Sequence, residues 1–258
     1  VDGNVPHVSE VIDPAADIDT INTELMIADM EALERRKTKI EKLAKSGDKE
    51  ARSQIEVLKK LVESINNGQP ARAVTVFTDE DQRFLKSLTL LSAKPVLYIC
   101  NVMDPGDTNN ELVQKVKAIS EEDGSVVVAL AGKIEGEIME MEDPEEQQMF
   151  MEEMGLTETG LDRLIATGYG LLELSTYFTA GEKETRAWTI PKNSKAPQAA
   201  GAIHTDFEKG FIRAEVYSLE DLEKYQTETA IKEAGKLRVE GKDYVVQDGD
   251  IMHFRFNV

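Results

Sequence analysis

Two short, uninterrupted apolar runs with a helical pattern between them constrain the fold of this chain most strongly. Val96–Cys100 and Ser125–Leu130 are rich in β-branched and large apolar residues, as expected for strands that are buried on both faces. Residues 109–122, which separate the two runs, have the apolar spacing of a helix. A strand–helix–strand order predicts parallel pairing through a right-handed crossover, and therefore an α/β sheet.

The region before these strands has helical periodicity. Residues 13–20 are polar and include a proline, which predicts a loop leading into a helix capped by Asp19 or Thr20. The apolar positions of that helix are Ile21, Leu25, Ala28, Leu33, Ile40 and Leu43. Ser46-Gly47-Asp48 predicts a turn with Gly47 in the left-handed conformation. The stripe of the following helix consists of Ile55, Leu58, Val62 and Ile65. We expect an antiparallel helical hairpin that projects into solvent.

The region after the second strand divides into two parts. Residues 144–154 and 158–174 have the spacing of further helices. The last eighty residues change to short strand-like runs around a helical stretch near 219–233, which predicts a small α+β domain. The expected strands are Arg186–Ile190, Phe211–Val216, Tyr244–Val246 and Ile251–Phe256.

Composition and charge exclude several classes of protein. With 41% hydrophobic and 31% charged residues the chain is globular, and it has no apolar run long enough to span a membrane. A single cysteine, Cys100, excludes an internal disulfide framework and favours a reducing, cytoplasmic location. The net charge of −19 argues against a protein that coats DNA. Residues 104–178 carry −14 of this charge, whereas residues 35–60 carry +6.

No self-sufficient catalytic centre or metal site is recognisable in the 258 residues. The three histidines have no ligand spacing, and one cysteine does not suffice for a zinc site. G-x-S-x-G, H-E-x-x-H and Gly-rich phosphate-loop motifs are absent from the sequence. The acidic middle is read as a solvated surface, with a carboxylate metal cage as the alternative. Cys100 is expected to be a small buried hydrophobe without an adjacent base.

The end of the first predicted strand offers the best candidate for ligand binding. Asn101-Val102-Met103-Asp104 follows the strand directly, at the carboxyl edge where parallel sheets bind ligands. This pattern resembles the base-reading N-K-x-D motif of GTP-binding proteins, with Val102 in place of the lysine. Ala131-Gly132-Lys133 follows the second strand, where a second base-contacting loop would lie. An ordinary β–α turn is the alternative for the Asn101–Asp104 segment.

Four long segments resemble one known family. Residues 177–189 (YFTAGEKETRAWT), 204–215 (HTDFEKGFIRAE) and 241–258 (GKDYVVQDGDIMHFRFNV) are similar to the TGS domain of the Obg-like ATPase family, the YchF group. Residues 17–25 (DIDTINTEL) are similar to the same family further upstream. The resemblance covers essentially the whole chain.

The resemblance implies a P-loop NTPase-type parallel sheet, an inserted antiparallel coiled-coil arm and a C-terminal β-grasp TGS domain. The implied division is 1–18 and 93–175 for parts of the nucleotide domain, 19–92 for the arm and 176–258 for the TGS domain. It further implies a ribosome-associated ATPase that acts in translation or the stress response, with GTP as a second possible substrate and Mg²⁺ as cofactor. Carried over to this sequence, Asn101, Val102, Asp104, Ala131 and Gly132 would bind the base.

The sequence departs from the family in three respects. The family motif is N-x-x-E, whereas Asp104 is the residue that guanine-specific proteins use at this position. Glu173 stands where a small or neutral residue is expected. The chain starts at Val1 without a methionine, which is read as a processed or truncated start. The phosphate loop, its lysine and the Mg²⁺ ligands are expected upstream of Val1, so a polypeptide of these 258 residues is predicted to be inactive.

Basic residues give the candidates for contact with a ribosome or ribosomal RNA, and DNA and membranes are not expected partners. The candidates are Arg35, Arg36, Lys37, Lys39, Lys42 and Lys45 of the hairpin and Lys209 and Arg213 near the C-terminus. A solvated helix face is the alternative for the hairpin, and a packed β-grasp core is the alternative for the neighbouring Phe211 and Phe254. A non-catalytic RNA- or ribosome-binding adaptor therefore remains an alternative function.

Overall fold

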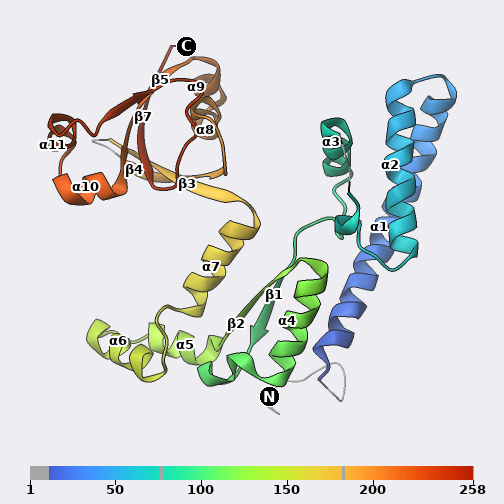
Figure 1. Cartoon of the computed structure of the whole chain (residues 1–258), viewed down its shortest axis with the longest axis horizontal. Helices are drawn as coiled ribbons and strands as arrows, with labels where there is room; N and C mark the ends of the chain where they lie inside the picture. The colour runs from blue at the N-terminus through green and yellow to red at the C-terminus, as the bar shows by residue number, and fades with distance from the viewer. Residues whose placement is uncertain (1–11, 76–77, 182–183, 258) are drawn as a thin grey trace. The chain divides into compact units, whose positions relative to one another are not determined.

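A computed structural model of the chain describes residues 12–75, 78–181 and 184–257 (Figure 1). Contacts divide the chain into two compact units, Val1–Leu164 and Ile165–Val258. Most of the segment 1–18, predicted to belong to a nucleotide domain, lies outside the described residues. No helix in the described ranges is both long and apolar enough to cross a membrane.

The first unit combines helices with a pair of strands. Its helices and 3-10 turns are α1 (Pro14–Lys45), α2 (Lys49–Asn66), η1 (Ala71–Ala73), α3 (Asp79–Leu88), η2 (Pro105–Asn109), α4 (Glu111–Asp123), α5 (Gly132–Met139), α6 (Pro144–Glu153) and α7 (Gly160–Leu171), which continues into the second unit. Its strands are β1 (Leu97–Asn101) and β2 (Val126–Leu130). The sequence did not predict helices α3 and α5.

Helix α1 begins earlier than predicted, so the loop expected at 13–20 is wrong. Asp13 is the N-cap, and its side chain accepts a hydrogen bond of 3.2 Å from the backbone N–H of Ala15. Pro14 occupies the first helical position, where its fixed φ and missing N–H are favourable. The proline that suggested a loop therefore starts the helix.

The buried side of α1 also differs from the predicted stripe. Leu33 and Ile40 are buried, as expected, but Ile21 is 61% exposed. The buried face includes Asp29, whose carboxylate accepts hydrogen bonds from Leu91 N (2.8 Å) and from Ser92 N and Oγ (2.7 and 2.6 Å). A buried, fully bonded carboxylate interrupts the apolar pattern, and the stripe cannot be read from hydrophobicity alone.

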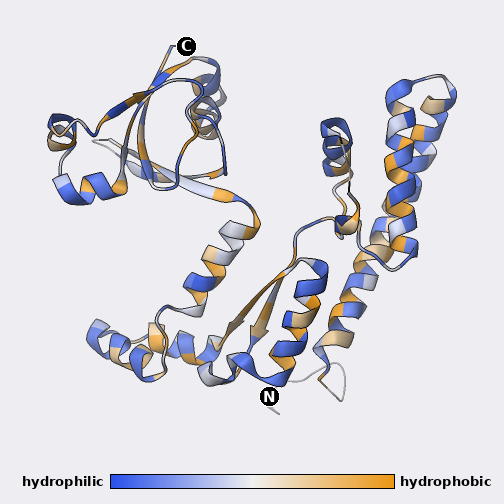
Figure 2. Ribbon diagram, viewed as in Figure 1, coloured by the Kyte–Doolittle hydropathy of each residue, from blue (hydrophilic) through white to orange (hydrophobic). Residues whose placement is uncertain are grey.

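The helical hairpin itself is confirmed. Gly47 has a φ of +97°, and Asp48 caps α2 by accepting from the N–H groups of Glu50 and Ala51. Leu58 and Leu61 of α2 are fully buried in the same cluster as the buried residues of α1. Figure 2 shows the apolar residues of α2 in orange on one side and charged residues on the other. Packing of two amphipathic faces stabilises helices that would be marginal alone.

The predicted parallel strand pair is present, with Leu97 opposite Val126 and Asn101 opposite Leu130. Helix α4 connects the strands and packs against β2. The expectation that both strands are buried on both faces is wrong for the described residues, because Val128 is buried but Ile99 is 52% exposed. One covering helix shields only one face of a two-stranded ladder, and Ile99 remains on the other.

The second unit is built around a five-stranded mixed sheet of order β4-β3-β7-β5-β6. Its strands are β3 (Leu174–Ala180), β4 (Thr185–Pro191), β5 (Phe211–Ser218), β6 (Arg238–Glu240) and β7 (Asp250–Phe256). Its further helices are α8 (Ala196–Ile203), α9 (Thr205–Lys209), α10 (Leu219–Tyr225) and α11 (Glu228–Glu233). β3 runs parallel to β7, and the other neighbouring strands are antiparallel.

The core of this unit lies between the sheet and α8. Tyr177 is fully buried and donates a 2.8 Å hydrogen bond to the carbonyl of Ala199. Phe211 is buried and Phe254 packs against the same cluster, at a ring-centroid distance of 6.2 Å. Both aromatic residues therefore belong to the core. This is the alternative that the sequence analysis gave to a contact surface for Phe211 and Phe254.

Several boundaries predicted for this region are wrong. Tyr244–Val246 forms only an isolated bridge between Val245 and Lys195. The stretch 219–233 is two helices, because Gln226 adopts a left-handed φ of +64°. The helix expected over 158–174 ends at Leu171, where Glu173 has a φ of +52°. Glycine is favoured in that conformation, so a small residue would fit the backbone at position 173 with less strain than Glu173.

Candidate functional site

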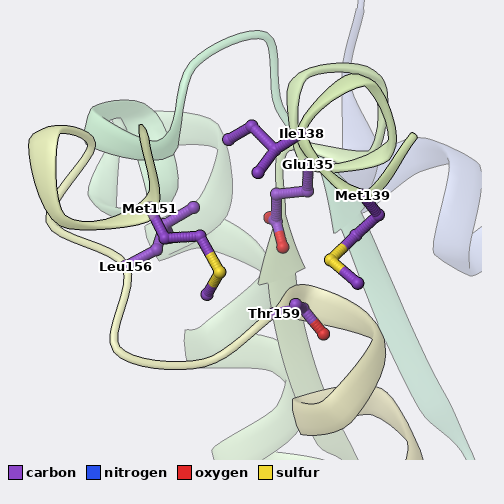
Figure 3. A pocket seen from close by; sticks show the side chains of 6 residues that line it. All are labelled: Glu135, Ile138, Met139, Met151, Leu156 and Thr159. Carbon is purple, nitrogen blue, oxygen red and sulfur yellow. The ribbon is translucent and has the colours of Figure 1, made fainter. Parts of the chain in front are cut away.

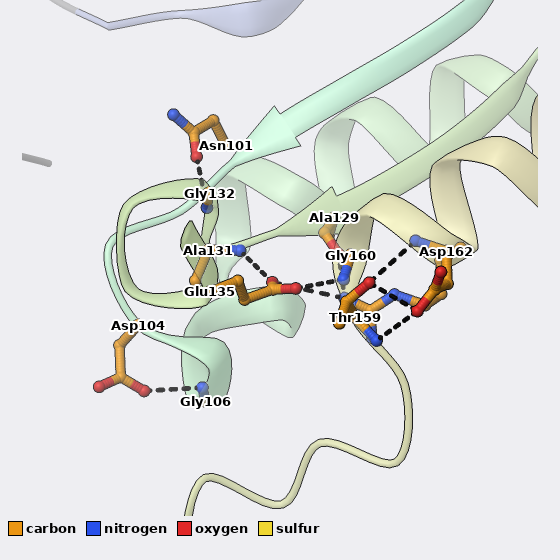
Figure 4. Close-up of polar contacts among 11 residues, drawn as sticks. Asn101, Asp104, Gly106, Ala129, Ala131, Gly132, Glu135, Thr159, Gly160 and Asp162 are labelled. Atoms are coloured by element: carbon orange, nitrogen blue, oxygen red, sulfur yellow. Dashed lines mark hydrogen bonds and ion pairs between the residues drawn. The ribbon is translucent and has the colours of Figure 1, made fainter. Parts of the chain in front are cut away.

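Asn101 is the last residue of β1, and its side chain links the two strand ends. Its Oδ1 atom accepts a hydrogen bond of 3.1 Å from the backbone N–H of Gly132, which begins α5 (Figure 4). The N–H of Val102 donates to the carbonyl of Leu130 at 2.9 Å. The structure thus brings Asn101 and Val102 together with the loop after β2, as expected for strand ends at one edge of a parallel sheet.

Gly132 lies close to the side chain of Asn101, so a larger residue here would press on that side chain. A Cβ atom added at Gly132 would lie 3.3 Å from Asn101 Oδ1 and 3.2 Å from the Leu130 side chain. Both contacts are tighter than ordinary van der Waals packing. Ala131, the preceding residue, is only 1% exposed. The loop formed by Ala131 and Gly132 is therefore closely packed, and the neighbouring Asn101 is exposed to solvent.

Glu135 holds the loop after β2 in place through a hydrogen bond to its backbone. The sequence alone did not identify it as a site residue. Its side chain is buried in α5, and Oε1 accepts a 2.8 Å hydrogen bond from the N–H of Ala131. Oε2 accepts from the N–H of Gly160 at the start of α7. The guanidinium of Arg163 lies 3.7 Å from Oε1 and donates to the carbonyl of Ala129 at 3.2 Å. One buried carboxylate therefore joins the β2–α5 loop to α7.

Asp104 has a local structural role in the loop after β1. Its carboxylate accepts a 2.7 Å hydrogen bond from the N–H of Gly106 and caps the η2 turn, with Pro105 at the first position (Figure 4). This is the β–α turn that was the alternative to a base-reading motif. Asp104 is exposed, so its capping contact leaves the carboxylate accessible from solvent.

The chemistry of Cys100 agrees with a packing role. The residue is only partly buried rather than fully buried as expected. Burial raises the pKa of its thiol, although the positive charge of Lys117 acts in the opposite direction. A raised thiol pKa reduces the thiolate fraction at neutral pH, and the thiolate is the nucleophilic form.

The described residues do not supply a metal site. Within residues 12–75, 78–181 and 184–257, no three His, Cys, Asp or Glu side chains form a group that could hold a metal ion. These residues therefore do not provide a set of side-chain ligands for the Mg²⁺ that the resemblance implies.

The basic residues of the hairpin differ in their availability. Arg35, Lys39, Lys42 and Lys45 are exposed, whereas Lys37 is half-buried. The guanidinium of Arg36 lies over the ring of Phe84 at 5.9 Å. Arg35, Lys39 and Lys42 are three or four residues apart, and they therefore share one face of α1.

The C-terminal candidates are in a different electrostatic setting. Lys209 is exposed, but Arg213 lies 3.9 Å from Glu215, which also contacts Arg255 at 2.9 Å. The hydrogen bond and positive charge of Arg255, with a further contribution from Arg213, lower the pKa of the Glu215 carboxyl. Glu215 thus neutralises part of the positive charge on this strand surface.

The fold is that of a mixed α/β protein, with a parallel strand pair in one unit and a mixed five-stranded sheet in the other. The family model YchF-GTPase_C, described as "Protein of unknown function (DUF933)", matches residues 174–257. The "Ribosome-binding ATPase YchF" of Bacillus subtilis (strain 168) is 52% identical over 260 residues, which is 100% of this chain and 70% of that protein. The protein of the same name from Escherichia coli O157:H7 is 50% identical over 99% of this chain and 70% of its own length.

A solved structure agrees with these sequence matches. The YchF GTPase of Schizosaccharomyces pombe superposes with a TM-score of 0.82 at 33% identity, covering 99% of this chain and 69% of that one. The chain belongs to the YchF family, as the motifs in the sequence indicated.

Proposed function

We propose that this chain is part of a ribosome-associated P-loop ATPase that hydrolyses ATP to ADP and phosphate, and that the edge formed by β1 and β2 binds the base. The observation that carries the proposal is the hydrogen bond between Asn101 Oδ1 and the N–H of Gly132. Because the carbonyl end of the amide is held by the loop, its NH₂ group is presented as a donor. A purine ring nitrogen is an acceptor that this group can bind.

The choice between ATP and GTP depends on a different residue. Adenine and guanine share the acceptor that Asn101 would bind, so this contact positions the base without distinguishing the two nucleotides. Guanine also offers N–H donors, which a carboxylate accepts. Asp104 is an exposed carboxylate in the same loop, and GTP is therefore retained as a second substrate.

The phosphate-binding part of the site is proposed to lie upstream of Val1. The 258 residues contain no G-x-x-x-x-G-K-[ST] motif, and it is this loop that cradles the phosphates in P-loop proteins. The described residues likewise lack a cluster of metal ligands. Residues at the β1–β2 edge would then orient the nucleotide while the upstream segment supplies the phosphate and Mg²⁺ contacts.

Base binding is tested with substitutions in the full-length protein. Asn101→Ala is expected to weaken ATP and GTP binding alike, by about tenfold or more, because a hydrogen-bonding side chain in the site is lost. Asp104→Glu is expected to change the ratio of the two affinities in favour of ATP. Isothermal titration with each nucleotide measures both effects. Asn109→Ala, an exposed asparagine in the following turn, is the matched control, and unchanged ATP affinity in Asn101→Ala would refute the assignment.

Ribosome association is proposed to involve the hairpin. Charge favours this, because residues 35–60 carry +6 in a chain of net charge −19, and phosphate contacts of Lys and Arg dominate affinity for RNA. Lys209 and Arg213 remain secondary candidates, since Glu215 offsets the charge of Arg213. An enzyme of this kind would act in translation or the stress response and be cytoplasmic.

Charge reversal on one face of α1 tests this contact. The triple variant Arg35→Glu, Lys39→Glu and Lys42→Glu is expected to reduce co-sedimentation with ribosomes by about tenfold or more, because three phosphate contacts become repulsive. The control carries Lys232→Glu, Lys236→Glu and Lys242→Glu, three exposed residues of the second unit. Equal loss in both variants would indicate a nonspecific effect of net charge and would contradict the proposal.

We propose that residues 19–92 are a coiled-coil arm inserted in a nucleotide domain of residues 1–18 and 93–175, and that 176–258 are a TGS domain of the β-grasp type. The sheet order β4-β3-β7-β5-β6, with α8 packed against β4 and β5, supports the last assignment.

An adaptor without catalytic activity is the second candidate function. The exposed basic face of α1 favours it, because that face needs no nucleotide to contact RNA. In an adaptor the α/β part serves only as scaffold. ATP binding that is insensitive to Asn101→Ala, together with ribosome binding that depends on Arg35, Lys39 and Lys42, would favour the adaptor.

A further inference from the structure

A buried hydrogen-bond network holds the helical hairpin to the segment that leads into β1. The hydroxyl of Ser92 donates to Asp29 of α1 at 2.6 Å and accepts a 3.1 Å hydrogen bond from the N–H of Ala71, the first residue of η1. The carbonyl of Ser92 accepts a 3.1 Å hydrogen bond from the N–H of Arg72. Asp29, Ser92 and Ala71 are no more than 3% exposed. The network therefore fixes α1 and η1 to the chain just before β1.

The side chain of Arg72 extends this network to α4. Its Nη2 atom lies 3.0 Å from Oδ2 of Asp123, the last residue of α4, and the two side chains are only 13% and 22% exposed. The same Nη2 atom donates to Oδ1 of Asn22 in α1 at 3.4 Å. Burial raises the pKa of the Asp123 carboxyl, but hydrogen bonds from Ser125 and Arg72 outweigh it, and the net shift of the pKa is downward. The pair is therefore ionic at neutral pH.

Asp123 in turn contacts the strand that carries Asn101. Its Oδ2 atom also accepts a 3.3 Å hydrogen bond from the hydroxyl of Tyr98 in β1. Its Oδ1 atom accepts a 2.9 Å hydrogen bond from the N–H of Ser125, which directly precedes β2. Asn101 is the last residue of the strand that contains Tyr98. One carboxylate thus connects Arg72 of the hairpin region with both strands of the candidate base-binding edge.

The guanidinium of Arg72 is only partly satisfied in this arrangement. Within the part of the chain that the structure describes, its Nε and Nη1 atoms are buried and have no hydrogen-bond partner. A buried donor without a partner is costly, and this cost offsets part of the attraction between the two charges. Both donors gain partners when the side chain leaves Asp123. An open arrangement therefore lies close in energy to the closed one, as a two-state element requires.

We propose that the Arg72–Asp123 pair couples the two binding sites, so that nucleotide at the β1–β2 edge changes the affinity of the hairpin for the ribosome. The inference rests on the proposed function, because it needs both ligands to bind at the places given there. Arg72 and Asp123 are positioning residues, and neither belongs to the base-contacting or ribosome-contacting set. A ligand that binds one state of the pair more tightly shifts the equilibrium, and the effect of each ligand on the other is reciprocal.

The first test measures co-sedimentation of the full-length protein with ribosomes, with and without a saturating non-hydrolysable ATP analogue. In the unvaried protein the analogue is expected to change ribosome affinity about fivefold or more. Arg72→Gln and Asp123→Asn are each expected to reduce this change to less than about twofold while both ligands still bind. The asparagine keeps an acceptor for Tyr98 and removes only the charge. An unvaried protein without the change, or variants that retain it in full, would refute the proposal.

Two control variants separate coupling from loss of charge and loss of stability. Glu121→Gln removes an exposed carboxylate two residues before Asp123 in α4. Leu156→Ala removes a buried side chain from a small pocket beside Glu135 in the same unit (Figure 3), and is expected to lower the urea midpoint of that unit. Both controls are expected to keep the full effect of the analogue on ribosome affinity. Loss of the effect in Leu156→Ala would overturn the proposal, because lower stability would then explain it.

Amide hydrogen exchange of the full-length protein follows the pair without the ribosome. The N–H groups of Ala71 and Arg72 both bond to Ser92, and the ATP analogue is expected to change their exchange rates about fivefold or more. Asp123→Asn is expected to abolish this change. The amide of Gly132 reports base binding in the same samples. If Gly132 responds while Ala71 and Arg72 do not, the coupling is refuted and the base site stands. If Gly132 does not respond, the proposed base site fails and the coupling fails with it.

Discussion

Replacing Glu135 with alanine is expected to destabilise the first unit by about 3 kcal/mol, because two backbone donors lose a buried acceptor. The donors are the N–H groups of Ala131 and Gly160. Arg163, whose side chain is 29% exposed, would also lose its counter-charge but can turn to solvent. The main cost therefore comes from the unpaired backbone groups rather than from the ion pair.

Two spectroscopic signals separate the units in this experiment. The chain has one tryptophan, Trp188 in β4, so its fluorescence reports urea unfolding of the second unit. Circular dichroism is weighted toward the first unit, which contains the long helices α1 and α2. We expect Glu135→Ala to move the dichroism transition to lower urea and to leave the Trp188 transition unchanged.

A neighbouring glutamate provides the control. Glu137 lies two residues further along α5 and is exposed, so Glu137→Ala is expected to change stability by no more than about 0.5 kcal/mol. Equal stability of the Glu135 and Glu137 variants would show that the buried carboxylate does not hold the loop. In the full-length protein, Glu135→Ala should also weaken nucleotide binding, since Ala131 and Gly132 lose their support.

The second large effect concerns catalysis. A purified polypeptide of residues 1–258 is expected to release phosphate from ATP no faster than buffer, because positioning and charge stabilisation by the phosphate loop and Mg²⁺ provide the catalysis in P-loop enzymes. A phosphate-release assay compares this polypeptide with one that also includes the upstream segment. The longer polypeptide is expected to turn over ATP, and turnover by the 258 residues alone would contradict the assignment of the catalytic groups.

The fold was predictable where local sequence and tertiary packing agree. The apolar runs around Ile99 and Val128 identify the parallel strands, and Ser46-Gly47-Asp48 identifies the hairpin turn, because strand runs and left-handed glycines have local signatures. Prediction failed where a tertiary contact or an unusual backbone conformation determines which face is buried or where a helix ends. Asp29 is a charged residue on the buried face of α1, so hydrophobicity alone does not identify that face. The helical pattern of the sequence continues to residue 174, but the left-handed backbone at Glu173 ends α7 before that point.

The candidate site was predictable to a similar degree. Asn101 and Gly132 follow the two strands directly, so topology alone brings them to one edge, and the structure joins them by a hydrogen bond. Glu135 was missed because it lies in a segment crowded with glutamates, where sequence gives no sign that one of them is buried. The capping role of Asp104 is local, and a contact with a base remains a prediction.

The central claim is that the edge formed by β1 and β2 binds the purine base, and amide NMR tests it most directly. In ¹⁵N spectra of the full-length protein, saturating ATP is expected to shift the side-chain amide of Asn101 and the backbone amide of Gly132 together. The side-chain amide of Asn109 serves as the reference and should stay in place. If ATP binds while the signals of Asn101 and Gly132 do not move, the base lies elsewhere and the account is wrong.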